Sequence, residues 1–475
     1  MKLYEALADE LAGLMDDGVL RPGDKLPSVR QQQERRGVSP STVFQAYYLL
    51  EARGFIEARP RSGYYVAARR FAAAPEPEVS RPALDPTRVD VSELVFQVLE
   101  ASRAPDMVPF GSAFPSPLLF PLQKLGRAVA ASMRDIDPWS TVADLPPGNA
   151  ALRRQIALRY QLDGVQVAPE DIVITNGALE ALNLCLQAVA RPGDTVLVES
   201  PSFYAALQAL ERLDLKAVEV ATHPREGIEL DALQTALVQH RPAACWLMTS
   251  FQNPLGSLMP AAKKEALVAL LAQHGVPLIE DDVYGELYFG SQRPALAKRF
   301  DSQGIVMHCS SFSKCLAPGF RVGWAAAGRH ARQVERLKLT TSLAAAMPSQ
   351  LALAEYLQQG GYERHLRQLR AALSAQQRQM LAAIEAHFPA GTRVTQPQGG
   401  YFLWVVLPEA VDALWLHQQA LLQGISIAPG PMFSAKREFR NCVRLNYGQG
   451  WDARQATAIA TLGQLARQAA AGITP

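Results

Sequence analysis

From about residue 107 onward, short apolar runs alternate with segments of helical periodicity, and this alternation limits the possible folds more than any other feature of the chain. Strands that are apolar throughout are typically buried on both faces, and strands separated by helices favour a mostly parallel sheet covered by helices on both sides. The sequence therefore predicts an α/β domain over residues 107–475. The clearest predicted strands are Ile172–Thr175, Thr195–Glu199, Cys245–Thr249, Pro277–Glu280 and Ile305–Cys309.

The C-terminal part of this domain has a different pattern. A long amphipathic segment at about 362–387 predicts a helix, and apolar runs at 400–406 and 442–446 predict strands before a closing helix. We therefore expect a smaller α+β subdomain over about residues 345–475.

Residues 1–70 form a separate predicted domain. A leucine stripe between residues 3 and 14 indicates a first helix. A second helix is expected to open near Ser28 and a third at Ser39, because serine is a favoured N-cap and Pro40 suits the first helical position. Two short strands, 54–57 and 64–66, complete a winged helix-turn-helix. The apolar side chains expected to face inward from the third helix are Val43, Ala46, Tyr47 and Leu50.

The charge balance of this domain is uneven. Residues 1–20 carry one lysine against five acidic residues, whereas residues 21–70 carry ten lysines or arginines against four acidic residues. A local basic excess fits a surface that faces the phosphates of double-stranded DNA, although a solvated protein face can have the same composition. The exposed turn of the third helix suits the major groove and the hairpin tip suits phosphates or the minor groove. The candidate DNA-binding residues are Arg30, Ser39, Ser41, Thr42, Gln45, Arg59, Arg61 and Gly63.

Between these domains, residues 71–106 are rich in proline and alanine at their start, which predicts an extended linker. A short amphipathic helix is expected within it at about 91–103. The five cysteines are scattered without a C-x-x-C pair, which indicates reduced thiols and no metal site. The chain lacks a signal-peptide pattern and a long apolar run, so we expect a cytoplasmic protein that does not enter a membrane.

Lys314 carries the strongest chemical signal in the chain. It follows a predicted strand and is flanked by the hydroxyls of Ser311 and Ser313, with Arg321 seven residues later. A lysine amine can condense with the aldehyde of pyridoxal 5'-phosphate, while hydroxyls and a guanidinium hold the phosphate. An isolated lysine after a strand is usually a surface residue, but this setting favours covalent attachment.

Four other segments supply the remaining contacts that this cofactor needs. Asp281 could keep the pyridine nitrogen protonated, although paired aspartates at a strand end more often cap a helix. Tyr284 and Asn253 could contact the ring hydroxyl oxygen, and Phe203 could stack on the ring unless it is a core residue. A phosphate-binding helix N-terminus is expected at Gly177 and Ala178.

Arg444 lies in an otherwise apolar predicted strand. A buried guanidinium requires a partner, and its fork fits a carboxylate through two parallel hydrogen bonds. We expect that carboxylate to belong to a bound substrate or effector; an internal Asp or Glu is the alternative. Most of the cofactor and effector candidates follow predicted strands, where open α/β sheets place their ligands.

Together these residues resemble pyridoxal phosphate enzymes of fold type I, over roughly residues 107–470. The resemblance rests on Asn253-Pro254, Asp281-x-x-Tyr284, Ser311-x-Ser313-Lys314, Arg321 and Arg444 in the family's order. Residues 1–70 are similar to the GntR-type winged helix-turn-helix, and the whole chain resembles the MocR family of transcription regulators. The resemblance implies a head-to-tail homodimer that binds promoter repeats and responds to an amino-compound effector. It also implies that Lys314 is the cofactor lysine and that Lys314, Asp281 and Tyr284 are its catalytic positions.

The chain departs from these families in two places. Residues 31–36, Gln-Gln-Gln-Glu-Arg-Arg, replace the more usual Leu-Ala at the start of the second helix. Ala143 lies where related chains often carry a tyrosine that reaches the partner subunit's cofactor phosphate; Trp139 is a candidate to fill part of that space.

Three hypotheses follow from the sequence. The first is a cofactor-dependent transcription regulator whose aminotransferase-like domain senses an effector. The second is a working aminotransferase with an appended DNA-binding domain. The third, a dimerisation domain without cofactor, is disfavoured because the polar cofactor residues would then be buried without partners.

Overall fold

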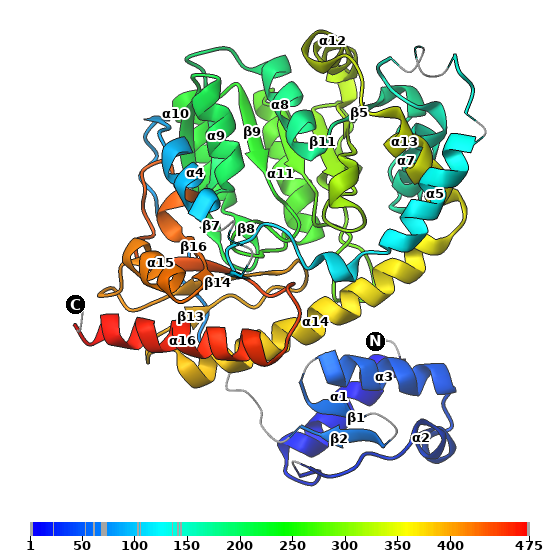
Figure 1. The fold of residues 1–475 in the computed structure, drawn as a ribbon, viewed down its shortest axis with the longest axis vertical. Helices are drawn as coiled ribbons and strands as arrows, with labels where there is room; N and C mark the ends of the chain where they lie inside the picture. Colours follow the sequence, from blue (N-terminus) through cyan, green and yellow to red (C-terminus); the bar gives the residue numbers. More distant parts are fainter. Residues whose placement is uncertain are drawn as a thin grey trace. The chain divides into compact units, whose positions relative to one another are not determined.

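The computed structural model describes residues 3–21, 23–52, 54–59, 62–67, 74–101, 104, 106–134, 136–139, 142 and 145–472; for Asp16, Ala52 and Glu57–Arg59 it describes the backbone alone. The chain forms two compact units, residues 1–74 and residues 75–475 (Figure 1).

The first unit contains the helix and hairpin elements expected of a winged helix-turn-helix. Helix α2 begins with a capping box, in which Ser28 accepts from the Gln31 amide and the Gln31 side chain accepts from the Ser28 amide. At the start of α3, the Ser39 hydroxyl accepts from the Thr42 amide at 3.2 Å. The expected cap residues are thus confirmed. The elements are α1 (Leu3–Asp16), α2 (Val29–Arg36), α3 (Pro40–Ala52), β1 (Ile56–Arg59) and β2 (Gly63–Val66).

A single apolar core joins these elements. The inward face of α3 is fully buried as predicted and packs against α1, with Ile56 and Val66 of the antiparallel hairpin at the edge of the core. Despite the unusual run at 31–36, α2 forms; its Gln32 is buried at 3 % exposure. The capping box supplies local stability that this polar helix would otherwise lack.

The second unit is built on a mixed, mostly parallel sheet, which confirms the predicted fold class. Strands β7, β6, β9, β10 and β11 pair in parallel, while β12 lies antiparallel between β11 and β5. The strands, in sheet order, are β3 (Thr87–Arg88), β7 (Lys216–His223), β6 (Thr195–Ser200), β9 (Ala244–Leu247), β10 (Leu278–Asp281), β11 (Val306–Ser311), β12 (Gly323–Ala326) and β5 (Ile172–Thr175), with β8 (Gly227–Ile228) paired to β7.

Helices cover both faces of this sheet (Figure 1). Helix α8 packs against β5, β10, β11 and β12, and α13 packs against both α5 and α7. Because α8 starts directly after β5, its N-terminus lies at the carboxyl end of that strand. The helices are α4 (Ser92–Ala101), α5 (Leu122–Arg134), α7 (Ala150–Leu162), α8 (Ala178–Val189), α9 (Tyr204–Arg212), α10 (Leu230–His240), α11 (Ala261–His274), α12 (Ala331–Ser342) and α13 (Met347–Gln358).

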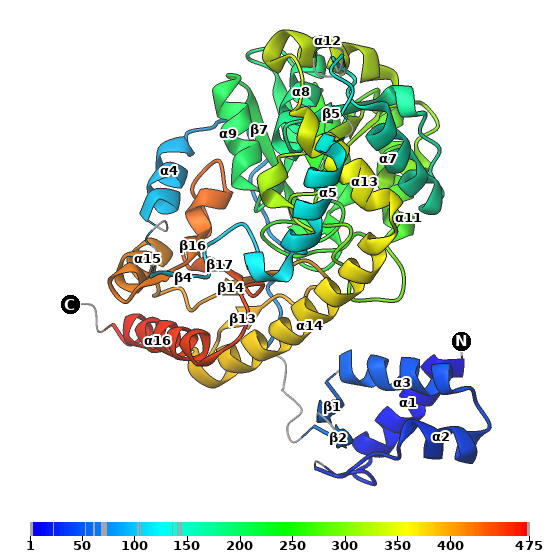
Figure 2. The ribbon, with the colours of Figure 1, turned by 45° about the vertical axis from the view of Figure 1, so that its right-hand side comes forward.

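The C-terminal elements form a second, smaller sheet with its own helices. The long helix α14 lies beside α16, as both ribbon views show (Figure 2). A short parallel pairing of β4 (Val108–Pro109) with β15 (Ile425–Ser426) brings the start of the α/β region to this subdomain. The other elements are α14 (Gly361–His387), β13 (Arg393–Val394), β14 (Phe402–Val406), α15 (Ala413–Leu422), β16 (Ala428–Pro429), β17 (Cys442–Asn446) and α16 (Ala453–Ala470).

The proline-rich segment that follows residue 74 runs along the second unit. Strand β3 pairs with β7, and the Ser80 hydroxyl donates to the Ser200 carbonyl at 2.6 Å. The Val91 and Ser92 amides both donate to the Glu211 carboxylate at 2.9 Å, which fixes the start of α4. The described residues of the expected linker are thus hydrogen-bonded to the second unit, through β6, β7 and α9. Within the described ranges, no helix is long and apolar enough to cross a bilayer.

Candidate cofactor and effector site

The predicted cofactor residues converge at the carboxyl ends of the parallel strands. Asp281 ends β10 and lies opposite Cys309 of β11, and Ser311 ends β11 three residues before Lys314. Gly177 lies between β5 and α8. Side chains alternate between the two faces of a sheet, so the cysteine opposite Asp281 reveals which face this aspartate occupies. Cys309 contacts Cys185 of α8, so Asp281 lies on the α8 face.

The amine of Lys314 contacts residues 113 and 114. Its Nζ donates to the Ala113 carbonyl at 2.8 Å and lies 3.6 Å from the centroid of the Phe114 ring. Burial, together with the nearby Arg444 charge, lowers the pKa of this amine to about 7, while Asp281 opposes the shift. A large neutral fraction is therefore present near pH 7, which is the form that attacks an aldehyde.

Asp281 is a buried carboxylate without an ion-pair partner among the described residues. Its side chain is almost inaccessible, and neither oxygen has a hydrogen-bond partner in this structure. Burial raises the pKa of its carboxyl to about 7, and the adjacent Asp282 contributes to that rise. A carboxylate left in this condition requires a cationic ligand or a proton. A protonated pyridine nitrogen satisfies that requirement, so Asp281 fits the predicted cofactor.

The two residues predicted to contact the ring hydroxyl are also buried. The Asn253 Oδ1 accepts from Arg444 at 3.0 Å, while its Nδ2 lacks a hydrogen-bond partner in this structure and can donate to a ligand. Tyr284 makes edge contacts with Tyr401 and Phe402, at 5.3 and 5.6 Å between ring centroids. The Tyr401 hydroxyl donates to the Ala113 carbonyl at 3.0 Å, the same carbonyl that binds Lys314. Sequence reasoning missed Tyr401, whose only local signal is an aromatic residue after two glycines.

The phosphate-binding candidates form a tight cradle. Gly177 has φ +85° and precedes α8 without a side-chain cap on the helix. The Arg321 guanidinium donates to the Asn176 carbonyl at 3.2 Å and to the Ser313 hydroxyl at 3.3 Å. A Cβ on Gly177 would collide with that guanidinium. An uncapped helix N-terminus beside an arginine is suited to an anion, so this part of the site also fits the phosphate.

Three further residues are predicted to contact the cofactor: Ser311, Ala178 and Phe203. The buried Ser311 hydroxyl accepts from the Ser313 amide at 3.3 Å, and Ala178 is the first residue of α8. Phe203 lies immediately before α9 with its ring 4.9 Å from that of Tyr204. Its stacking on a cofactor ring stays a prediction.

Arg444 is fully buried on β17. Its Nη2 donates to the carbonyls of Gly111 at 2.6 Å and Ser112 at 3.3 Å, while its Nε has no partner. The guanidinium also lies 4.2 Å from the centroid of the Phe402 ring. Within the described part of the chain, Arg444 forms no ion pair with an Asp or Glu. Its positive charge is therefore available to a ligand carboxylate.

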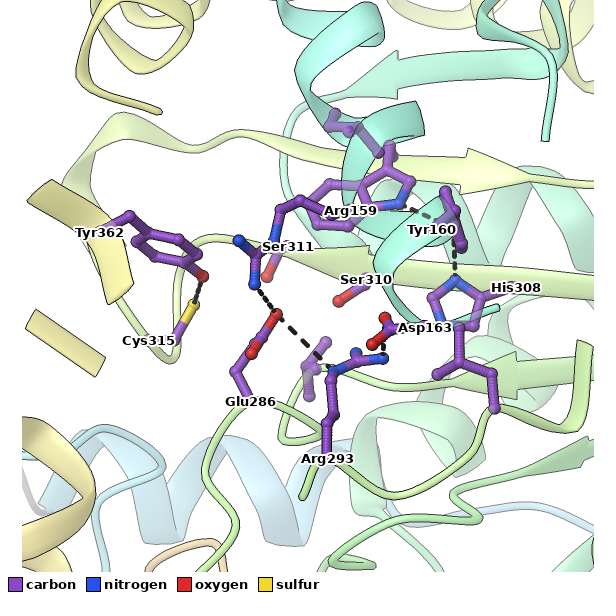
Figure 3. Close-up of a pocket in the computed structure, with 14 residues that line it drawn as sticks. Arg159, Tyr160, Asp163, Glu286, Arg293, His308, Ser310, Ser311, Cys315 and Tyr362 are labelled. Carbon is purple, nitrogen blue, oxygen red and sulfur yellow. Dashed lines mark hydrogen bonds and ion pairs between the residues drawn. The ribbon is translucent and has the colours of Figure 1, made fainter. Parts of the chain in front are cut away.

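A second group of charged residues lies on the other face of β10 and β11, around a pocket (Figure 3). We call Arg159, Asp163, Asp282, Glu286, Arg293 and His308 the ionic cluster. Arg293 binds Asp163 and Asp282 at 2.6 Å each, and Arg159 binds Glu286 at 2.5 Å. Burial alone would raise the pKa of Asp282, but Arg293 and His308 hold it below its usual value. Each carboxylate of this cluster thus has an arginine partner.

The candidate DNA-binding residues lie in the first unit. Arg30 is exposed and pairs with Glu34 at 3.1 Å, and the Ser39 hydroxyl contacts the hydroxyls of Ser41 and Thr42 at 2.8 Å each. Gln45 is exposed on the same helix. Gly63, at φ +108°, begins the second strand of the hairpin. Arg61 and the Arg59 side chain fall outside the described residues.

The position expected to carry a tyrosine, Ala143, also falls outside the described residues. Trp139 is described and is 77 % exposed. Whether it fills space beside a partner subunit's cofactor stays a prediction.

Comparisons with known proteins separate the same two parts of the chain. Residues 3–66 match the family described as bacterial regulatory proteins of the gntR family, and residues 124–461 match aminotransferase class I and II. The uncharacterized HTH-type transcriptional regulator YdcR of Escherichia coli is 50 % identical over 98 % of this chain and 100 % of its own length. The 2-aminoadipate transaminase of Thermus thermophilus is 34 % identical over 74 % of this chain and 88 % of its own length.

Solved structures of aminotransferases are similar to most of this chain. The α-aminoadipate aminotransferase LysN of Thermus thermophilus, solved in complex with N-(5'-phosphopyridoxyl)-L-leucine, has a TM-score of 0.73 and 32 % identity. It covers 81 % of this chain and 96 % of its own chain. A multiple substrate aminotransferase from Thermococcus profundus has a TM-score of 0.74 at 25 % identity, covering 81 % of this chain and 96 % of its own.

Proposed function

Since this chain belongs to the aminotransferase class I and II family and joins that domain to a gntR-family helix-turn-helix, the arrangement of MocR-type regulators, we propose that it is a transcription regulator that binds pyridoxal 5'-phosphate and senses an amino-compound effector. The observation that supports this proposal most is a group of charges without ion-pair partners around Lys314. Asp281, Lys314 and Arg444 are each charged groups without an ion-pair partner in the described structure.

Each residue has a separate role in this proposal. Asp281 holds a proton on the ring nitrogen, Arg321 and the α8 N-terminus bind the phosphate, and Asn253 and Tyr284 orient the ring. When bound, pyridoxal phosphate supplies an aldehyde that condenses with amines and a ring that withdraws electrons from them. Arg444 binds the carboxylate of an effector. The first unit, as a homodimer, binds promoter DNA through the exposed N-terminal turn of α3 and the hairpin.

The direct test is a spectroscopic titration of the full-length protein with pyridoxal phosphate. We expect visible absorbance to develop in the parent protein and in Lys216→Ala, which changes an exposed lysine at the start of β7. Lys314→Ala should show no such band, because the attached amine is absent. A band of equal intensity in Lys314→Ala would show that another lysine holds the cofactor.

Lys314 and Asp281 are also consistent with a second function, a working aminotransferase. The 34 % identity to a named transaminase supports this alternative. Turnover of an amino acid and keto acid pair by the purified protein, without sequence-selective DNA binding, would favour the enzyme. Selective binding to a promoter fragment that responds to an amine would favour the regulator.

A further inference from the structure

One short loop contacts both the lysine that we assign to the cofactor and the arginine that we assign to the effector. Residues 111–114, which we call the strap, run between β4 and α5. The Gly111 and Ser112 carbonyls accept from Arg444 Nη2, and the Ala113 carbonyl accepts from Lys314 Nζ. Three successive main-chain carbonyls therefore lie on the carboxylate-binding guanidinium and on the reactive amine.

The strap contacts matter because a carboxylate would bind Arg444 through the same nitrogen atom. A carboxylate binds arginine most strongly through two parallel N–H bonds, using either the Nη1–Nη2 edge or the Nε–Nη2 edge. Both edges include Nη2. Nη2 has two hydrogens, and in this structure it makes two hydrogen bonds, both to strap carbonyls. A bidentate carboxylate on Arg444 therefore requires at least one strap carbonyl to leave.

Asn446 holds the strap in this position. It lies two residues after Arg444 on β17 and is fully buried. Its Nδ2 donates to the Ser112 carbonyl at 2.9 Å and to the Phe114 carbonyl at 2.7 Å, while its Oδ1 accepts from the Gly448 amide at 2.7 Å. The side chain thus clamps the strap at two carbonyls that flank Ala113.

We propose that the strap is a built-in competitor of the effector: Asn446 holds its carbonyls on Arg444, and a carboxylate binds Arg444 by displacing them. This inference rests on the proposed role of Arg444 as the effector's carboxylate anchor. It assigns Asn446 as a positioning residue, since it acts on the site through the strap. It also places the structural response to the effector in residues 111–114, which follow the segment that leads from the DNA-binding unit.

The experiment uses the full-length, cofactor-loaded protein with propionate as a carboxylate without an amine and propylamine as an amine without a carboxylate. Amide hydrogen exchange of residues 110–116 reports the strap, because the Ser112, Phe114 and Ser116 amides are hydrogen-bonded in this structure. We expect propionate to increase exchange in this segment and propylamine to leave it unchanged. Protection of the segment by propionate would show that the strap closes over the ligand and would overturn the proposal.

Asn446→Ala tests the clamp. Removing two hydrogen bonds to the strap should raise the affinity for propionate roughly three- to tenfold in calorimetry. The matched control is Asn441→Ala, which removes a bond from an asparagine at the other end of β17 to the Leu407 carbonyl and should leave the affinity unchanged. If Asn446→Ala does not fold, Gln449→Ala removes a separate bond to the Phe114 carbonyl and should change the affinity in the same direction.

The outcomes separate the two proposals. A reduced or unchanged affinity for propionate in Asn446→Ala, with the cofactor absorbance intact, would overturn the strap and leave cofactor binding standing. Absence of propionate binding in both parent and Asn446→Ala would count against the strap as well. Failure of the parent to develop the cofactor absorbance would instead contradict the proposed function.

Discussion

The two faces of strands β10 and β11 differ in how their buried charged side chains are neutralised. On the α8 face, Asp281 and Lys314 have no ion-pair partner in the described structure, and neither has Arg444 nearby. On the other face, Arg293 pairs with both Asp163 and Asp282. The neighbours Asp281 and Asp282 show the contrast most directly: burial raises the pKa of the first, whereas arginine and histidine partners lower that of the second.

This contrast distinguishes a binding site from a structural network of ion pairs. Burial of charge is common to both faces and therefore identifies neither. A buried charge with internal partners is already stabilised, whereas one without partners needs a ligand or a change of protonation state. The unpaired face is accordingly the one we assign to the cofactor. Most residues of the ionic cluster line the pocket in Figure 3, but we assign the cluster a structural role.

The largest expected effect on stability is at the ionic cluster. Arg293→Met should lower the free energy of unfolding by about 3–5 kcal/mol, because Asp282 and Asp163 would lose their cationic partner while buried. Urea denaturation of the parent and variant measures this change. Arg332→Met, which removes an exposed pair with Glu335, should change stability by less than about 1 kcal/mol. Equal effects of the two substitutions would contradict the structural assignment.

Asp281→Asn should have the opposite sign in the cofactor-free protein. The pKa of Asp281 is about 7 when folded and about 3.9 when unfolded. Below about pH 4 both states are protonated and the group has no effect; as the pH rises from about 4 to 7, ionisation favours the unfolded state. The variant should therefore be more stable than the parent at pH 8, by roughly 2–4 kcal/mol.

Unfolding at pH 5 and pH 8 measures this prediction. The stability difference between Asp281→Asn and the parent should shrink toward pH 5, and addition of cofactor should reverse it at pH 8. A difference that does not depend on pH would mean that the Asp281 charge is compensated within the folded chain.

Gly177→Ala tests the predicted phosphate cradle. Positive φ alone should destabilise the variant by about 1–2 kcal/mol, and the added Cβ would also displace Arg321. Gly193→Ala is the matched control, since Gly193 has φ +91° with open space around its Cβ position. The loss of stability should be at least as large in Gly177→Ala as in Gly193→Ala, and cofactor affinity should fall roughly tenfold in Gly177→Ala alone. Fluorescence titration with pyridoxal phosphate distinguishes them.

The smallest change in stability is expected at Arg30 in the first unit. Its pair with Glu34 is exposed, so Arg30→Ala should alter the free energy of unfolding by less than about 0.5 kcal/mol. If Arg30 contacts a phosphate, the slope of log affinity for promoter DNA against log salt should flatten by about one. An unchanged slope would show that Arg30 does not contact a DNA phosphate. The exposed Arg30–Glu34 pair would then be no evidence for a DNA-binding role.

Much of the fold was predictable because its signals are local. The five predicted strands appear within a few residues of their expected bounds, and the helices opened by Ser28 and Ser39 begin where their caps predict. Strands β7 and β12 were harder to recognise. The first contains Lys216, Glu219 and His223, and the second is short and rich in alanine, which has weak strand preference.

Most of the elements, their order and the chemical identity of the Lys314 segment could be predicted from the sequence, because hydrogen-bond caps, hydrophobic periodicity and neighbouring hydroxyls act over a few residues. The opposite surroundings of Asp281 and Asp282 could be seen only in the folded structure, since the helices packed on each face come from distant parts of the chain. It also decided that carbonyls at 111–113 reach Lys314 and Arg444. Contacts across hundreds of residues depend on strand order and packing, which no local pattern encodes.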